Sequence, residues 1–250
     1  MREQIDTIPV NEAFDAGDEC PFCILARKAE QSAIRYVIGP GASYMEPDVR
    51  GVTDEKGFCR EHMKKLYDYG NMLGCALILQ THYAGLLEQF KKEAENFEQP
   101  PKKSLFGKKP TVTDRWWQRL QEKEQSCYLC EKNDYNMARY YHTFFALLKE
   151  PEFRQKVETG KGFCMRHFAK LMQIAEDKLP NALHDWFYPT ILGIMEENLT
   201  RVKEDLDWFV GMFDYRQAGA DWKNSRDAVA RTIQKLKGIY PADPPYKEKK

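Results

Sequence analysis

The sequence contains two copies of one cysteine and histidine pattern, and this duplication constrains the fold more than any other feature. In each copy, two cysteines are separated by two residues, and a Gly-Phe-Cys-x-x-His segment follows after a long gap. The gap is 35 residues between Cys23 and Cys59 and 33 residues between Cys130 and Cys164. Three thiolates and one imidazole form a complete tetrahedral ligand set for zinc. The pattern therefore predicts two metal sites, one in each copy.

We expect eight residues to bind these ions, four in each copy. They are Cys20, Cys23, Cys59 and His62 for the first copy and Cys127, Cys130, Cys164 and His167 for the second. Four protein ligands leave no open coordination position, which indicates a structural site. Two Zn²⁺ ions per chain are the favoured cofactors, and iron is the alternative, although an iron–sulfur cluster more typically uses four cysteines. The alternative without a metal is that the eight residues are ordinary core residues.

The duplication extends beyond the ligands. A Glu-Pro-acidic-apolar-Arg string occurs at 46–50 and again at 150–154, shortly before each Gly-Phe-Cys. Proline suits the first position of a helix because its missing N–H has no partner there. Each string therefore predicts a short helix, and the glycine that follows predicts a turn, since glycine adopts backbone angles that other residues avoid.

The remaining segments have helical periodicity. One long apolar stripe contains Leu79, Tyr83, Leu86, Phe90, Ala94 and Phe97, and its counterpart contains Ile191, Met195, Leu199, Val202, Leu206, Phe209 and Phe213. Such spacing places one apolar face of a helix toward a core. Sustained strand-like alternation does not occur. We predict an all-α protein of two tandem helical repeats, each held by one Cys3His metal site.

Four regions follow from the repeat. Residues 1–98 form the first metal-binding repeat, 99–113 a linker rich in proline and lysine, 114–213 the second repeat, and 214–250 a C-terminal helix and tail. The last helix is expected at about 225–236, followed by Gly238.

Composition restricts the function classes. The chain has 38 basic and 38 acidic residues, a balance that argues against a dedicated nucleic-acid binder. No apolar run approaches the roughly 20 residues of a membrane helix. The N-terminus lacks the charged start and apolar core of a signal peptide, which favours a cytoplasmic location and reduced thiols. Cys75, outside both motifs, is expected to be a small buried hydrophobe.

The motifs resemble an uncharacterised family of bacterial proteins with a duplicated CxxC…G[FL]CxxH motif. The string Phe213-Asp214-Tyr215-Arg216 and the later Asp221-Trp222 are similar to the C-terminal segment of that family. The resemblance implies bacterial origin, helical duplication and metal ligation by the eight residues, and it implies no substrate.

Several functions therefore stay open. The leading hypothesis is a zinc-stabilised module that binds a protein or another ligand, because no acid–base constellation is evident. The alternatives are a thiol and zinc redox sensor, or an enzyme with a site between the repeats that uses His82, His142 or His184. The oligomeric state and the identity of the partner do not follow from the sequence.

Overall fold

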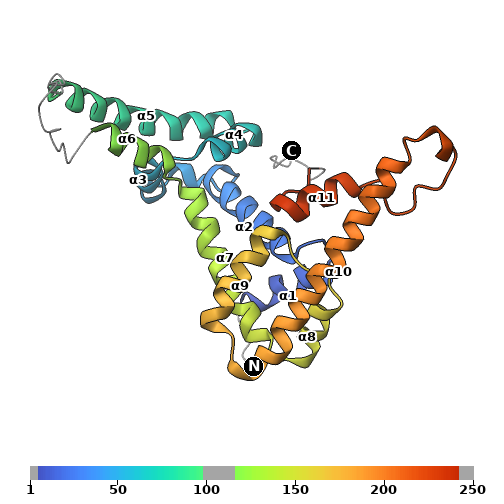
Figure 1. The fold of residues 1–250 in the computed structure, drawn as a ribbon. Coiled ribbons are helices and arrows are strands. Elements are labelled where there is room, and N and C mark those ends of the chain that lie inside the picture. Colours follow the sequence, from blue (N-terminus) through green and yellow to red (C-terminus); the bar gives the residue numbers. More distant parts are fainter. Residues whose placement is uncertain (1–4, 98–115, 242–250) are drawn as a thin grey trace, which may run out of the picture. The chain divides into compact units, whose positions relative to one another are not determined.

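The structure, a computed structural model, describes residues 5–97 and 116–241 (Figure 1). All regular elements of these residues are helices, so the predicted all-α class is confirmed. The predicted linker at 99–113 and the end of the predicted tail lie outside the described residues.

The helices follow one another in two series. The first series is α1 (Thr7–Asp15), α2 (Pro21–Ile38), α3 (Pro47–Lys56), α4 (Arg60–Tyr69) and α5 (Met72–Glu95). The second is α6 (Trp116–Gln125), α7 (Tyr128–Leu147), α8 (Pro151–Glu158), α9 (Met165–Lys178), α10 (His184–Gly211) and α11 (Ala228–Lys237). Short 3-10 turns lie at Ser43–Met45, Asn181–Leu183 and Tyr215–Gln217.

The helical duplication is confirmed. Helices α2 and α7 begin directly after the first cysteine of each C-x2-C pair, and α3 and α8 begin at the two predicted prolines. Cys59 and Cys164 are the N-cap residues of α4 and α9. The motifs thus stand at helix starts. Helix α11 also matches its prediction and ends at Gly238, whose left-handed backbone and N–H bond to the Gln234 carbonyl stop the helix. Helix α1 was not expected from the sequence.

The chain divides into two compact units that differ from the predicted regions. Among the described residues, unit 1 contains 5–29 and 134–241, and unit 2 contains 30–97 and 116–133. Both boundaries fall inside long helices, α2 and α7, so each of these helices belongs to both units. Each sequence repeat therefore supplies residues to both units. A long helix permits this division because its two ends are far enough apart to enter separate cores.

Aromatic side chains dominate the core of unit 1. Phe22 is fully buried, and its ring centroid lies 5.6 Å from that of Phe144 and 5.7 Å from that of Phe163. Phe14 of α1 packs against the same rings, 5.6 Å from Phe144 and 6.3 Å from Phe163. Edge-to-face and tilted rings at these spacings contribute attraction beyond the burial of their apolar area. Helix α1 therefore belongs to this core through Phe14.

Unit 2 has a smaller core of aliphatic and aromatic residues. Its buried members are Ile34, Val37, Ile38, Phe58, Leu66, Tyr69, Cys75, Ile78, Cys127, Tyr128 and Leu129. The predicted burial of Cys75 is thus confirmed.

The apolar stripe of α5 does not face a core, contrary to the prediction. Leu79, Tyr83, Phe90 and Phe97 are all exposed, whereas the buried residues of α5 are Gly74, Cys75 and Ile78. Helix α5 packs on α3 and α4 through a different and shorter face near its N-terminus, and of the stripe residues Phe90 and Phe97 contact the ring of Trp116 at the start of α6. The stripe of α10 agrees better, since Ile191, Met195 and Val202 are buried. None of the described helices is long and apolar enough to cross a membrane.

A substitution at Gly57 tests how much the tight turn of the Gly-Phe-Cys motif contributes to stability. Gly57 has φ +63°, and a Cβ added there would lie 2.8 Å from Cε1 of His82. We predict that Gly57→Ala destabilises the protein by about 1–3 kcal/mol, since the substitution adds backbone strain and a steric clash. Gly51→Ala is the control, because Gly51 lies inside α3 with no neighbour within 4 Å. Chemical unfolding of the two variants measures the difference, and equal midpoints would contradict the prediction.

Candidate metal centres

The structure brings all eight predicted ligands together in two groups of three cysteines and one histidine. Centre 1 consists of Cys20, Cys23, Cys164 and His167, and centre 2 consists of Cys59, His62, Cys127 and Cys130. Within each group the ligand atoms lie within 4.8 Å of one another. The prediction of two groups, each of three cysteines and one histidine, is therefore confirmed. Centre 1 lies entirely in unit 1 and centre 2 entirely in unit 2.

The predicted pairing of the half-sites is wrong. We expected Cys20 and Cys23 to join Cys59 and His62, but each C-x2-C pair joins the C-x-x-H pair of the other repeat. Cys23 and Cys164 are 141 positions apart in the sequence, about four times the separation of Cys23 and Cys59. Loop closure becomes only about 0.6 kcal/mol more costly for each doubling of loop length, so the longer connection costs only about 1.2 kcal/mol more. Packing of the units easily outweighs that difference.

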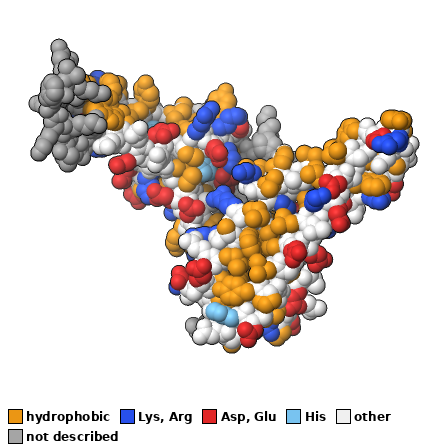
Figure 2. All heavy atoms as spheres, in the orientation of Figure 1, with side chains coloured by type: hydrophobic (Ala, Val, Ile, Leu, Met, Phe, Trp, Pro, Cys, Tyr) orange, Lys and Arg blue, Asp and Glu red, His pale blue; other side chains and the backbone are white. Residues whose placement is uncertain are grey.

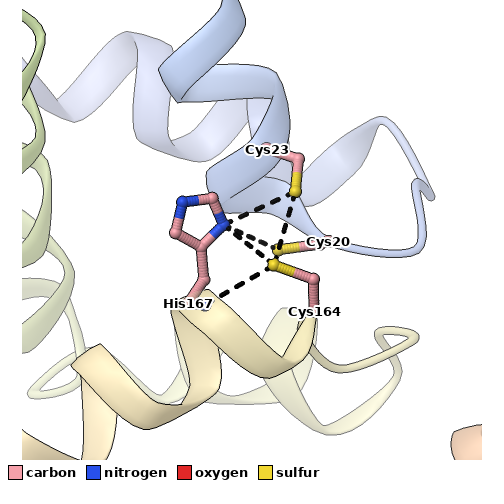
Figure 3. Close-up of side chains that lie close together, drawn as sticks. All are labelled: Cys20, Cys23, Cys164 and His167. Atoms are coloured by element: carbon pink, nitrogen blue, oxygen red, sulfur yellow. Dashed lines mark hydrogen bonds between the residues drawn. The ribbon is translucent and has the colours of Figure 1, made fainter. Parts of the chain in front are cut away.

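The four side chains of centre 1 surround one point (Figure 3). Nδ1 of His167 lies 3.4 Å from Sγ of Cys20, 3.4 Å from Sγ of Cys23 and 3.3 Å from Sγ of Cys164. The sulfurs of Cys23 and Cys164 are 3.6 Å apart. The cysteines come from the start of α2 and the cap of α9, and the histidine from the first turn of α9.

Centre 2 has nearly the same geometry. Nδ1 of His62 lies 3.3 Å from Sγ of Cys59, 3.2 Å from Sγ of Cys127 and 3.4 Å from Sγ of Cys130. The sulfurs of Cys59 and Cys130 are 3.8 Å apart.

These distances fit a shared metal ion. A tetrahedron with metal–sulfur bonds of about 2.3 Å has edges of about 3.8 Å, and the shorter metal–nitrogen bond brings the mixed edges to about 3.5 Å. Hydrogen bonds cannot explain the arrangement, because one imidazole nitrogen carries at most one proton yet faces three sulfurs at similar distances. The donor set and its spacing therefore fit Zn²⁺ or a similar tetrahedral ion.

Helix starts favour the negative charge of such a centre. Two thiolates of each centre come from the beginning of α2 or α7, and the third from the N-cap of α4 or α9. The partial positive charge of a helix N-terminus stabilises nearby anions. Cys164 also accepts the backbone N–H of His167 at 3.5 Å, and Cys127 accepts that of Cys130 at 3.4 Å.

The pKa shifts at centre 2 show that its thiols favour a nearby cation. Burial raises the pKa of Cys127, but the hydrogen bond to His62, backbone hydrogen bonds at Cys59 and Cys130 and the charge of His62 together outweigh it and lower the pKa to about 6. Burial would lower the pKa of His62, but Cys127 and Glu30 outweigh it and raise the pKa to about 10. Burial and the neighbouring thiols raise the pKa of Cys130. A divalent ion would allow all three thiols to ionise and would release their protons.

A carboxylate supports the histidine of centre 2. Oε1 of Glu30 lies 2.9 Å from Nε2 of His62 and 2.6 Å from Nζ of Lys65. Since the carboxylate accepts a proton from Nε2, Nδ1 is left free to bind a metal ion. Glu30 was not predicted from the sequence, because it lies in the middle of α2 and helical spacing alone does not show which carboxylate reaches a histidine.

Packing next to the ligands explains the exchanged pairing. Phe22 lies inside the first C-x2-C pair and Phe163 directly precedes Cys164, so their contact holds the two halves of centre 1 together. In centre 2 the backbone N–H of Tyr128 donates to the carbonyl of Gly57 at 3.0 Å. Each half-site is thus joined to its partner by the residues between and beside the cysteines.

The other three histidines have separate surroundings. His82 donates from Nδ1 to the Asp54 carbonyl at 2.9 Å and supports the turn at Gly57. His184 begins α10 and packs against Tyr188. His142 is exposed and borders a surface cavity of about 390 Å³. The other residues around this cavity are Asp6, Tyr135, Ala138, Arg139 and Thr143.

The sequence matches a known family along nearly its whole length. A family model described as "Family of unknown function (DUF6062)" matches residues 1–243. The chain belongs to this family. The match agrees with the resemblance to an uncharacterised family that the duplicated motif indicated, and it assigns no activity. Comparison with curated proteins and with solved structures finds no match.

Paired substitutions test the exchanged pairing. We predict that Cys20→Ser with Cys164→Ser removes two ligands from centre 1 and leaves centre 2 intact, so the protein retains about half its metal. Cys20→Ser with Cys59→Ser damages both centres and loses nearly all of it. Elemental analysis after dialysis against a chelator gives the metal content. Pairing within each repeat would produce the opposite result.

The Glu30 carboxylate is expected to strengthen centre 2. We predict that Glu30→Gln lowers the metal affinity of centre 2 about 10- to 100-fold and leaves centre 1 unchanged, since it weakens the acceptor of the histidine proton. Glu61→Gln, an exposed carboxylate beside His62 in the sequence, is the matched control. Competition titration with a chromogenic chelator measures both affinities. Equal affinities of the two variants would count against this role.

Proposed function

We propose that this protein holds two structural zinc ions and acts as a protein-interaction module. Three thiolates and one imidazole are a donor set typical of structural zinc, and four protein ligands leave no position for a substrate. Structural zinc contributes on the order of 10 kcal/mol of binding free energy, which couples directly to folding. We assign the ions the role of holding each unit together, because each centre joins residues that are distant in the sequence.

The main support for a protein-interaction role is an uncharged, exposed stretch of α5. Charged residues make up 30% of the chain, yet the 16 residues 72–87 contain no Asp, Glu, Lys or Arg. A helix that lies alone on a protein surface normally has charged residues on its outer side. The outer side of residues 72–87 lacks charged residues, which supports contact with another apolar surface.

The exposed side chains of this stretch share one face of the helix. We define the α5 face as Leu73, Ala76, Leu79, Tyr83 and Leu87. With 3.6 residues per turn, these positions span well under half of the helix circumference. Leu73 is 68% exposed and Tyr83 is 67% exposed. Figure 2 shows hydrophobic side chains at the surface along α5.

The α5 face fits a protein partner of a particular kind. Apolar side chains repeated every three or four residues fit the apolar face of another amphipathic helix. Tyrosine is frequent at such contacts because it has a large apolar ring and a polar end. The exposed apolar face would also be costly to leave in water. A helix-forming segment of a protein partner is therefore the proposed ligand.

A reducing compartment fits this proposal. Zinc centres of this type need their cysteines as thiolates, and an oxidising compartment would favour disulfides. We therefore propose a cytoplasmic location.

A second candidate function is thiol-based sensing at centre 2, which the partial exposure of Cys59 and Cys130 favours. Hydrogen peroxide would take two electrons from two thiolates and two protons from the solvent and become two water molecules, while the two sulfurs form a disulfide and the zinc ion leaves. Zinc release under mild peroxide, reversed by a reductant, would support sensing. Unchanged zinc content would eliminate it.

Substitutions on the α5 face test the interaction role. We predict that Leu73→Glu with Leu87→Glu abolishes binding of the partner, because charges would then be buried in an apolar contact. The free energy of unfolding should change by less than about 1 kcal/mol, since both side chains are exposed. Lys91→Glu, an exposed position further along α5, is the control.

The measurement is in-cell crosslinking followed by mass spectrometry of the wild type and both variants. Proteins crosslinked by the wild type and the control, and lost in the double variant, would support the proposal. An identical set of crosslinked proteins from all three would contradict it.

A further inference from the structure

We infer that the two metal centres are unequal: helix α11 covers centre 1 and keeps its ion in place, whereas centre 2 is the centre that exchanges its ion with soluble metal-binding ligands. The inference rests on the proposed zinc occupancy and adds which centre responds to ligands that compete for zinc. Four observations support it, taken from the end of α11, its anchoring, its surroundings and the exposure of the ligands.

The end of α11 lies directly against the sulfurs of centre 1. A Cβ added to Gly238 would be 3.2 Å from Sγ of Cys164 and 3.5 Å from Sγ of Cys23. Cys23 is the only partly exposed cysteine of centre 1, and Cys20 and Cys164 are buried. Only glycine fits this position well, because its backbone has φ +76° and the sulfurs leave little room for a side chain. The glycine backbone therefore acts as a lid over the thiolates.

Helix α11 is anchored by buried charges. Lys235 is 2% exposed, and its Nζ lies 3.2 Å from Oε2 of Glu19, which is 3% exposed. Arg231 pairs with Asp205 at 2.8 Å and with Asp227 at 2.8 Å. Buried ion pairs are costly to separate because each charge would lose its partner. Helix α11 packs on α9 and α10 (Figure 1), and the pairs of Lys235 with Glu19 and of Arg231 with Asp205 connect it to other parts of unit 1.

The anchor is connected to both halves of centre 1. Nζ of Lys235 donates to the backbone carbonyl of Glu19 at 2.8 Å, and Glu19 directly precedes Cys20. It also donates to the carbonyl of Lys161, three residues before Cys164. A zinc ion with three thiolates has a net charge of −1, which a nearby ammonium group favours. Closure by α11 and occupation of centre 1 thus stabilise each other.

Two of the three cysteines of centre 2 are partly exposed, compared with one of three in centre 1. Cys59 and Cys130 are both partly exposed. The two described glycines nearest to its ligands in the sequence differ from Gly238, because neither lies against a sulfur. A Cβ added to Gly57 would meet His82, and Gly70 has no neighbour within 4 Å. The partial exposure of Cys59 and Cys130 gives an incoming donor atom access to the thiolates of centre 2.

This difference predicts the kinetics of exchange. At centre 2 a chelator nitrogen or oxygen can bind the ion as one thiolate leaves and takes up a proton. At centre 1 the same substitution requires α11 to undock first. The release rate at centre 1 is then reduced by the small fraction of molecules in which α11 is open.

The first experiment follows release of zinc from the full chain, loaded with two ions, into an excess of the chromogenic chelator 4-(2-pyridylazo)resorcinol. We expect two phases of equal amplitude that differ at least tenfold in rate. Cys59→Ser should keep only the slow phase and Cys164→Ser only the fast phase. A single rate for both ions, or a slow phase that belongs to centre 2, would overturn the inference.

The second experiment uses matched variants and does not depend on removal of any ligand. Gly238→Ala should accelerate the slow phase at least fivefold and leave the fast phase unchanged. Gly219→Ala is its control, because Gly219 also has a positive φ of +87° but no neighbour within 4 Å. Lys235→Met should act like Gly238→Ala, whereas Lys237→Met, at an exposed position of α11, should not.

The outcomes separate this inference from the proposed function. A chain that retains no metal after expression in zinc-supplemented medium would overturn the proposed zinc sites themselves. A chain that retains two ions but releases them with rates insensitive to Gly238→Ala and Lys235→Met would overturn only the role of α11.

Discussion

The gathering of three cysteines and one histidine from exchanged half-sites is the constraint on which the rest of this structure depends. Each C-x2-C pair can supply only two ligands, and the other two come from the opposite sequence repeat. The aromatic contact of Phe22 with Phe163 and the backbone bond from Tyr128 to Gly57 bring the halves together. Neither repeat contains a complete site of its own, so the two repeats stabilise each other.

The exchange also gives the two centres different surroundings although their ligands are the same. Centre 1 lies beside a large aromatic core and under α11, while centre 2 lies beside a smaller core and relies on the Glu30 carboxylate. We therefore expect metal binding and chain packing to be coupled more strongly at centre 1. The two ligand sets have identical composition and nearly identical spacing in the sequence, so the motifs alone do not predict this difference.

Helix α5 shows where a local pattern stops being sufficient. Its apolar residues recur at helical spacing, and the helix is present as expected. The pattern cannot state what covers the apolar face, because a core within the same chain and a surface on another protein require the same spacing. In this chain Leu79 and Tyr83 are exposed. The spacing that predicted core residues is therefore equally consistent with residues that contact a protein partner.

The sequence by itself determined the helices, their starts at the motif cysteines and the eight residues that form the centres, because capping, periodicity and ligand chemistry are local properties. Tertiary structure decided the pairing of half-sites, the role of Glu30 and the cover that Gly238 provides. Two equal half-sites combine as well across repeats as within them, and the cost of a longer loop grows too slowly to choose. Side-chain packing made that choice.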